Sequence, residues 1–461
     1  MAPRGYRQRH PRESLLYQIL EAHLESFEAA YEERFAGLYG RLRSSPSRGD
    51  SEECVMPAFR HFLDCANPLQ GFARLRCEGC GRERLVPFSC RSRCVCPSCE
   101  MRKAIEWAEW VAEGLLEPLP HVQAVLSIPK LLRPYFRYDR GLLAELARCA
   151  WQALKLYIEQ SLEAPPGYQA GAVVCIQTFA ENLRWNPHVH VLLLSGMLNQ
   201  AGEFLPLSHW DLQVLSEIFR REVCRMLQSK GLLTDERLRL LYSWRHSGFH
   251  VHIGAPLDPR HNRSALEGLA RYLVRAPVRH AQLLVDPSPS ENVELSSDSD
   301  QDRPSDSTVL LRLQRPDQVT GESVERLSGL ELLARLSLHV PQPYQPLRFY
   351  YGAYSNLARH HRAALPTPEY QQHSEQQEQQ AGISRKAWRR RWAYLINKIY
   401  GENPLVCGHC GGEMKVLGLI TEPKTIDTIL GFLRKYHPER LPGASQDPAP
   451  THQSRAGPAV L

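Results

Sequence analysis

The pattern of apolar and polar positions predicts helices and strands that follow one another without regular alternation. Apolar residues recur at helical spacing in five segments, over residues 13–45, 101–119, 141–162, 212–233 and 265–277. Shorter apolar or alternating runs predict four strands, over residues 122–129, 171–180, 188–198 and 247–256. This order favours an α+β domain with a largely antiparallel sheet over a doubly wound fold.

Changes in composition divide the chain into further segments. Residues 286–308 are acidic, rich in serine and almost devoid of apolar side chains, which predicts a disordered insertion. The predicted segments are N-terminal helices (10–55), a Cys-rich domain (56–104), the mixed domain (105–285), the insertion, the remainder of the mixed domain (309–365), a polar linker (366–384), a basic helix with a CxxC module (385–440) and a disordered tail (441–461).

Composition and charge narrow the class of protein only slightly. A chain of 461 residues with 43% hydrophobic residues is long enough for two or three packed units. The net charge of +6 suits a polyanionic partner but does not require one. Because no apolar run approaches the roughly 20 residues that span a bilayer, and the N-terminus lacks the apolar core of a secretory signal, we expect a soluble, intracellular protein without a membrane partner.

Cysteines supply the first sharp chemical signal. Eight of the 13 cysteines lie between Cys54 and Cys99, and they include two CxxC pairs fifteen residues apart, Cys77 with Cys80 and Cys96 with Cys99. Two such turns can present four thiolates to one tetrahedral zinc ion. Four cysteine ligands leave no open position for chemistry, so this Zn²⁺ is predicted to be structural.

The remaining cysteines leave alternatives open. Cys90 and Cys94 either replace a member of a CxxC pair or join a second site with Cys65 or His61. A later CxxC motif, Cys407 to Cys410, shows only two ligands. A lone motif of this kind is more often a turn-forming relic than a full site, unless His409 or His437 completes it.

A His-x-His strand suggests a second kind of metal site. His188 and His190 alternate with valines, so both imidazoles point to one face of a strand and can meet one metal ion. A hairpin through residues 181–187 would bring Gln177 beside them as a third ligand. Such a neutral set leaves positions open for water and phosphate oxygens, which favours Mg²⁺ or Mn²⁺. An isolated His-x-His is nevertheless often only half-buried structure.

A second His-x-His, His250 and His252, cannot be excluded by spacing alone. This second pair has no candidate third ligand upstream comparable to Gln177. Its alternative role is to line a groove for DNA.

Among 18 tyrosines, Tyr272 stands out because it lies on a predicted helix between Arg271 and Arg275. Cations there would stabilise a phenolate and hold a phosphate, and a tyrosine phenol can attack a phosphodiester. A structural tyrosine flanked by solvated arginines is the competing interpretation. The basic helix near residue 390 offers further phosphate contacts through Arg389 and Arg390.

Taken in order, these motifs resemble the rolling-circle insertion-sequence transposases of the HUH nuclease superfamily that carry an N-terminal cysteine zinc domain. The matching segments are FLDCANPLQGFARLRCEGCGRERLVPFSC with CPSC, VLSIPKLLR, GAVVCIQTFAENLRWNPHVHVLLLSG, FHVHIG, LARYLVRAPV, HVPQPYQPLRFYYGAYS and PLVCGHCGGEMKVLGLIT.

The resemblance implies an antiparallel HUH palm over residues 105–285, with His188 and His190 on a central strand and Tyr272 as nucleophile on a nearby helix. Gln177 follows as third ligand by analogy with the superfamily. Some members carry a second tyrosine four residues earlier, where this chain has Gly268, so it resembles a single-tyrosine variant.

The activity implied by the resemblance is nicking and rejoining of single-stranded DNA through a 5′-phosphotyrosine during rolling-circle transposition. The implied partners are element ends and hairpins, with a homodimer possible, in the nucleoid-associated bacterial cytoplasm. The alternative is an inactive or regulatory zinc-dependent DNA-binding protein.

Overall fold

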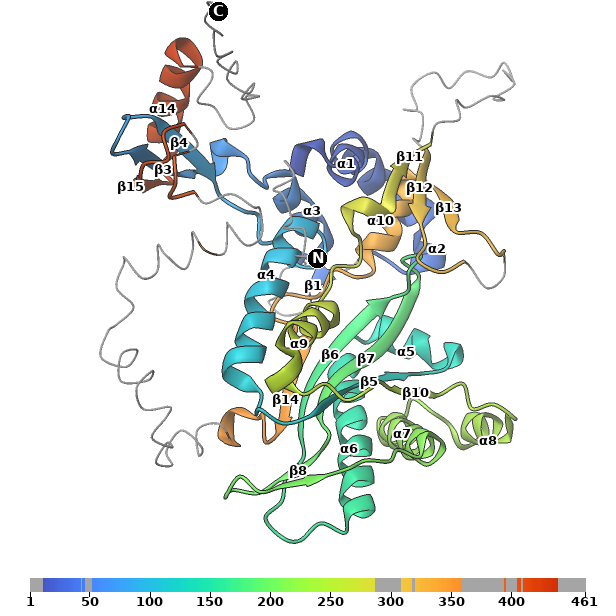
Figure 1. Cartoon of the computed structure of the whole chain (residues 1–461). Helices are drawn as coiled ribbons and strands as arrows, with labels where there is room; N and C mark the ends of the chain where they lie inside the picture. Colours follow the sequence, from blue (N-terminus) through green and yellow to red (C-terminus); the bar gives the residue numbers. More distant parts are fainter. Residues whose placement is uncertain are drawn as a thin grey trace, which may run out of the picture. The chain divides into compact units, whose positions relative to one another are not determined.

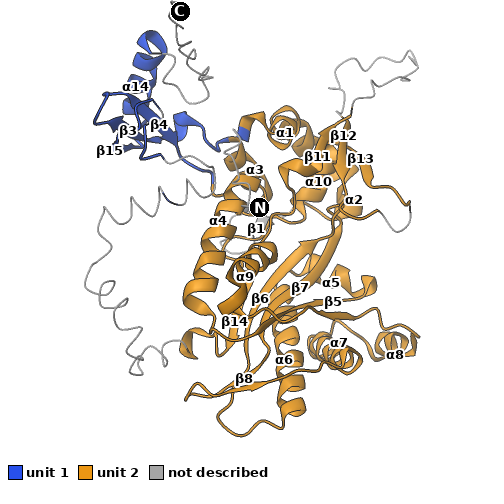
Figure 2. Ribbon diagram, viewed as in Figure 1, with its two compact units in different colours: residues 1–11, 64–90, 392–461 blue, residues 12–63, 91–391 orange. Residues whose placement is uncertain are grey.

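The computed structural model describes residues 11–42, 44–45, 52–286, 308–316, 320–358, 394, 404–407 and 409–437. These residues fall into two compact units, shown in Figure 2. Unit 1 contains residues 1–11, 64–90 and 392–461, and unit 2 contains residues 12–63 and 91–391. Within the described residues, no helix is both long and apolar enough to cross a membrane.

The centre of unit 2 is a five-stranded sheet in the order β10-β5-β7-β6-β14, in which every pair of neighbours is antiparallel (Figure 1). Its strands are β10 (His250–Ile253), β5 (His121–Ser127), β7 (Trp185–Leu194), β6 (Gly171–Phe179) and β14 (Arg348–Gly352). β6 is buried along its whole length, and β6 and β7 form a hairpin at the middle of the sheet. The four strands predicted from the sequence are therefore all present, and the antiparallel sheet is confirmed.

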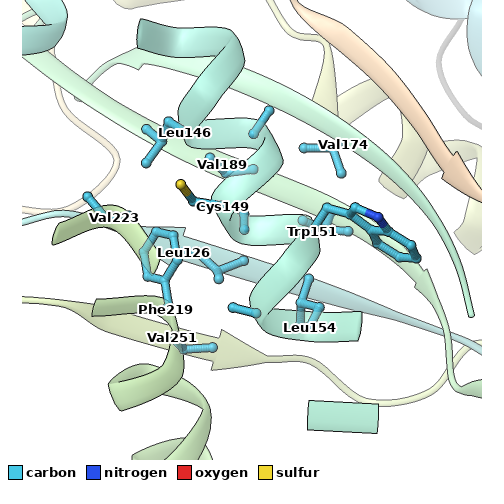
Figure 3. Close-up of a cluster of buried hydrophobic side chains, with 14 of the residues drawn as sticks. Leu126, Leu146, Cys149, Trp151, Leu154, Val174, Val189, Phe219, Val223 and Val251 are labelled. Atoms are coloured by element: carbon cyan, nitrogen blue, oxygen red, sulfur yellow. The ribbon is translucent and has the colours of Figure 1, made fainter. Parts of the chain in front are cut away.

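One face of this sheet packs against α6 (Leu142–Leu162) and α7 (Leu212–Ser229). Alternate strand residues, among them Leu126, Val189 and Val251, meet apolar residues of both helices, as Figure 3 shows. Because this layer takes every second strand residue, the intervening residues all point to the opposite face.

The opposite face is covered over only part of its width. α4 (Pro97–Trp110), the following π-helical turn η3 (Val111–Leu115) and α9 (Pro259–Leu273) pack on β6 and β7. Gln123, Val125 and Ser127 of β5 are half-buried on this face, and the residues of β10 that share it are exposed. α9 therefore borders an open strip of the sheet. The helix predicted over 101–119 is correct as far as Trp110, where the π-helical turn begins.

The remaining elements of unit 2 surround this sandwich. They are α1 (Leu15–Arg34), α2 (Ala36–Tyr39), β1 (Ser44–Ser45), β2 (Glu52–Glu53), α3 (Val55–Leu63), η4 (Lys130–Leu132), α5 (Arg133–Tyr138), β8 (Gly196–Leu198), β9 (Phe204–Pro206), α8 (Asp235–Ser243), η5 (His280–Gln282), β11 (Leu283–Val285), β12 (Thr308–Arg312), β13 (Val324–Ser328) and α10 (Gly329–Ser337). α1 and α2 confirm the helices predicted at the N-terminus.

Unit 1 is a small three-stranded sheet in the order β15-β3-β4, with a helix packed on it. Its elements are η2 (Pro68–Gln70), β3 (Phe72–Cys77), β4 (Glu83–Pro87), β15 (Met414–Ile420) and α14 (Pro423–Tyr436). The core contains Phe72 and Leu85 from the first two strands and Ile426, Leu430 and Leu433 from α14.

The pairing of β15 with β3 corrects the predicted organisation of the C-terminal region. From the sequence we expect a helical module separate from the Cys-rich domain, but the structure adds a strand of that module to the Cys-rich sheet. The physical reason is that β3 alternates buried with more exposed residues and needs a neighbouring strand on each edge. A sheet of β3 and β4 alone would leave one edge of β3 unpaired. The basic helix over 385–392, with Arg389 and Arg390, the linker, the tail and most of the acidic insertion lie outside the described residues.

Candidate active site and metal centres

The His-x-His pair lies at the middle of the central sheet. The rings of His188 and His190 point to the face that α9 borders, and their centroids are 4.8 Å apart. β6 returns to β7 through a tight turn, in which Leu183 adopts a φ of 60° and Ala180 N–H donates to Arg184 O. The resulting register places Gln177 directly opposite His188. The hairpin predicted from the sequence therefore forms.

The amide of Gln177 has a fixed orientation. Its Nε2 donates to the backbone carbonyls of Tyr272 and Leu273, at 3.1 Å each. Carbonyl oxygens only accept hydrogen bonds, so the nitrogen must face them and Oε1 must face away. The side chain is 3% exposed, and Oε1 finds no hydrogen-bond partner among the described residues. Its lone pairs are therefore available to a hydrogen-bond donor or to a metal ion.

The two histidines are neutral near pH 7. Burial is the main cause that lowers the pKa of His188 to about 4 and that of His190 to about 2, and the positive charge of Arg275 contributes to both shifts. His188 Nδ1 lies 2.8 Å from the carbonyl of Asn186, which can only accept, so the proton is on Nδ1 and Nε2 carries the lone pair. His190 Nε2 is buried and, among the described residues, unpartnered. Neutral imidazole nitrogens and an amide oxygen fit a divalent cation.

Tyr272 lies in the last turn of α9, beside the histidines. Its ring stands perpendicular to that of His190, with centroids 5.4 Å apart, and 42% of the residue is exposed. The guanidinium of Arg275 lies 4.8 Å from the tyrosine ring and 5.4 Å from that of Phe179. Arg275 Nε is buried and has no partner among the described residues. A half-exposed phenol and an unsatisfied cationic donor therefore lie next to the candidate metal ligands.

Three more arginines contribute charge around this site. Arg271, predicted from the sequence, is half-buried on α9 and donates from Nε to Glu267 O at 3.4 Å. The sequence did not indicate Arg133 and Arg279. Burial lowers the pKa of both arginines. The charge of Arg133 contributes to the lowered pKa of His188, and Arg279 interacts electrostatically with Tyr272. Neither arginine follows a periodic pattern, so no sequence signal distinguishes it.

Gly268 occupies the position one helical turn before Tyr272. A Cβ added there would meet Arg271 Nη2 at 4.0 Å, which is an ordinary contact. Packing therefore does not explain why this position lacks a side chain.

The second His-x-His lies on the same face of the sheet, at its edge. His250 pairs across β5 with Ser127, which in turn pairs with His188, so the two histidines are in line across two strand spacings, about 10 Å. Both His250 and His252 are exposed. They line the open strip and do not belong to the site around His190.

Another missed residue touches His190. The amide nitrogen of Gln123, on β5, lies 3.3 Å from His190 Nδ1. This contact places a polar group behind the imidazole, where it can fix the tautomer of the ring. The alternation of β5 was visible in the sequence, but the register that brings Gln123 to His190 was not.

Four cysteines of unit 1 form one group, which corrects the predicted zinc site. Cys77 and Cys80 lie with Cys407 and Cys410, and the four sulfurs are all within 4.8 Å of one another. The predicted grouping of Cys77 and Cys80 with Cys96 and Cys99 is wrong. β4 runs back along β3 for five residues and carries the chain about 16 Å from the first CxxC turn before Cys96 is reached.

Cys96 and Cys99 are buried at the N-terminus of α4, in unit 2. Cys94 stands outside the group of four, and burial raises its pKa to about 12.

Two protein-family models match this chain, one over the histidines and Tyr272 and the other over the N-terminal Cys-rich region. A family model described as "Putative transposase" matches residues 171–364, which include His188, His190 and Tyr272. A second model, the IS91-type "Transposase zinc-binding domain", matches residues 40–128.

Two curated proteins are similar to this chain. The transposase for insertion sequence element IS801 of Pseudomonas savastanoi pv. phaseolicola is 23% identical over 309 residues, which cover 64% of this chain and 68% of that protein. A protein of Sinorhizobium fredii (strain NBRC 101917 / NGR234) described as "Putative transposase y4qJ" is 27% identical over 158 residues, 32% of this chain and 37% of the relative. No solved structure matches significantly.

Proposed function

Because the chain belongs to the family of insertion-sequence transposases that includes the IS91 and IS801 proteins, we propose that it nicks and rejoins single-stranded DNA through a 5′-phosphotyrosine at Tyr272. Transposases bind DNA and cleave and transfer its strands. The finer proposal is an HUH-type palm, formed by the central sheet, that supports rolling-circle transposition in the bacterial cytoplasm, in association with the nucleoid.

The observation that carries this proposal is the double role of Gln177. Its Nε2 holds the carbonyls of Tyr272 and Leu273, while its Oε1 points away, buried and unpaired among the described residues. One side chain thus couples the turn that bears the nucleophile to β6, the strand paired with the one that bears the histidines. A metal ligand needs an oxygen with available lone pairs, and this orientation of the amide provides one beside the histidines.

We assign His188, His190 and Gln177 as the protein ligands of Mg²⁺ or Mn²⁺. Three neutral ligands leave coordination positions for water and for phosphate oxygens, as these hard cations require. When bound, the ion would act as a Lewis acid that polarises the scissile phosphate. Gln123 would orient His190: with its amide turned so that Oε1 faces Nδ1–H, it leaves the lone pair on Nε2.

In the proposed reaction, the phenol oxygen of Tyr272 attacks the phosphorus and loses its proton. A new bond joins the tyrosine to the 5′ phosphate, and the bond to the 3′ oxygen breaks, so that this oxygen leaves as a 3′ hydroxyl and gains a proton. Arg275, whose Nε is unsatisfied, would hold the phosphate, with Arg271 nearby. Because one phosphodiester replaces another, rejoining needs no nucleotide hydrolysis.

The reverse step would use a different 3′ hydroxyl, and this transfers the 5′ end to a new partner strand. With Gly268 in place of a second tyrosine, the acceptor is such a hydroxyl, water or a group on a second subunit of a homodimer. We place single-stranded element ends and hairpins along the open strip of the sheet, which leads from Tyr272 past the exposed His250 and His252.

The test uses labelled single-stranded oligonucleotides that tile the DNA flanking the coding region, each strand separately, with Mn²⁺ or Mg²⁺. We expect nicking by the wild type and none by Tyr272→Phe or by His188→Ala with His190→Ala, while all three bind the same oligonucleotide equally. Binding without nicking by the wild type on every strand would favour the inactive or regulatory DNA-binding protein.

A further inference from the structure

The two CxxC turns of unit 1 are built alike. In the first, Cys77 N–H donates to Arg82 O and Gly81 N–H donates to Cys77 O. In the second, Cys407 N–H donates to Gly412 O and Gly411 N–H donates to Cys407 O. The glycine after each pair has nearly the same positive φ, 72° for Gly81 and 71° for Gly411. A turn of this kind points both sulfurs of a CxxC pair to one side.

These two turns face each other across the β3–β15 pair. Met414, two residues after the second turn, pairs with Cys77, and Glu78 N–H donates to Glu413 O. The Sγ atoms of Cys77 and Cys410, which are 333 residues apart in the sequence, are 3.4 Å apart, and those of Cys80 and Cys407 are 3.7 Å apart. Thiolates that hold zinc at about 2.3 Å in a tetrahedron lie about 3.8 Å from one another. The sulfurs are thus already at zinc-binding separation.

The surroundings of the sulfurs also suit a thiolate cluster. A Cβ on Gly412 would lie 3.3 Å from the sulfurs of both Cys410 and Cys77, so a larger residue there would crowd them. The guanidinium of Arg76 lies beside the Gly81 turn, where a Cβ would meet its Nη2 at 3.9 Å. Four thiolates on one Zn²⁺ carry a net charge of −2, which a nearby cation and backbone N–H groups offset. Cys80 N–H lies 3.5 Å from Cys77 Sγ in this role.

We propose that Cys77, Cys80, Cys407 and Cys410 bind one Zn²⁺ that closes a zinc ribbon from two distant parts of the chain. The ribbon is formed by β3 and β4 on one side and by residues 404–407 and 409–420 on the other. Because β15 and α14 fold onto the Cys-rich sheet next to this cluster, the metal fastens the C-terminal region to it.

Zinc content of variants of the full-length protein tests the pairing of the two motifs. We expect Cys77→Ser with Cys80→Ser to lose one zinc per chain, Cys407→Ser with Cys410→Ser to lose one, and all four substitutions together still to lose only one. Cys224→Ala changes a buried cysteine of α7 outside this group; it is the control and should keep the zinc content of the wild type. A loss of two ions in the fourfold variant, or of none in the C-terminal pair, would overturn the proposal.

A second measurement on the wild type guards against variants that fail to fold. Cys80 and Cys410 are exposed, so without a metal both should react at once with an alkylating reagent. With zinc bound, we expect Cys77, Cys80, Cys407 and Cys410 to be protected and then to become reactive together as a chelator removes one equivalent, as mass spectrometry of the peptides would show. Alkylation of Cys407 and Cys410 while Cys77 and Cys80 stay protected would contradict a shared ion, and so would disulfides in protein purified under reducing conditions.

Discussion

Replacing Gln177 with leucine separates its two proposed roles, because they affect the metal-free and metal-bound protein differently. The substitution removes two hydrogen bonds to the carbonyls of Tyr272 and Leu273, at about 0.5–1.5 kcal/mol each. It also removes a buried oxygen without a partner among the described residues, whose desolvation costs about 1–3 kcal/mol. These effects oppose each other, so the free energy of unfolding of the metal-free variant should lie within about 2 kcal/mol of that of the wild type.

With metal present the balance changes. The oxygen of the wild type gains the ion as its partner, and leucine offers no ligand. We therefore expect Gln177→Leu to bind Mn²⁺ at least about tenfold more weakly, which corresponds to about 1.4 kcal/mol. Titration of the protein while the electron paramagnetic resonance signal of free Mn²⁺ is recorded measures this affinity. Zinc that is already bound by the cysteines does not contribute to the signal.

Thr178→Val is the matched control for this measurement. Thr178 follows Gln177 on β6, faces the other side of the sheet and loses one buried hydrogen bond, to His339 at 3.0 Å. It should lower stability by about 1 kcal/mol and leave Mn²⁺ affinity unchanged. Our reasoning would be refuted by a Gln177→Leu variant that binds Mn²⁺ like the wild type and is destabilised by about 3 kcal/mol or more. Gln177 would then only hold α9.

Three further predictions concern the surroundings of the metal ligands. The folded-state pKa values of His188 and His190 lie below the ordinary value of about 6.5. Their contribution to stability is therefore present above that pH and is lost as pH falls toward 4. In chemical denaturation, the free energy of unfolding of the metal-free wild type should fall more steeply between pH 6.5 and 5 than that of His188→Gln with His190→Gln. Gln123→Leu should weaken Mn²⁺ binding about 10–100-fold in the same resonance titration, and an unchanged affinity would exclude it as an orienting group. Arg275→Gln should slow nicking about 10²–10³-fold in single-turnover assays while metal affinity stays within twofold, and an unaltered rate would argue against a phosphate contact.

Local sequence signals predicted most of the central sheet and its helices. The alternation around His188 fixed which face it shares with His190, and the short connection to β6 implied a hairpin that brings Gln177 alongside. The placement of Tyr272 on an amphipathic helix also followed from neighbouring residues alone. What could not be predicted is the orientation of the Gln177 amide, since it depends on where the end of α9 lies in space.

The cysteine pairing shows the limit of reasoning from spacing. Two CxxC motifs fifteen residues apart satisfy the distance requirement for one zinc, and nothing local reveals that a strand carries them apart. The true partner of Cys77 lies more than 300 residues later, and only the β3–β15 pairing brings it near. For the same reason Arg133 and Arg279 could not be predicted. They stand at the starts of the short helices α5 and η5, whose positions beside the site follow from no periodic pattern.

The most direct test of the central claim is to identify the residue that becomes attached to DNA. The wild type would be incubated with a 5′-labelled and a 3′-labelled single strand that it nicks, digested with protease, and the DNA-linked peptide sequenced by mass spectrometry. We expect an adduct on the peptide containing Tyr272, joined to the 5′ phosphate and absent from Tyr272→Phe. An adduct on another tyrosine, an attachment at a 3′ phosphate, or efficient nicking with no covalent adduct would contradict the role proposed for Tyr272.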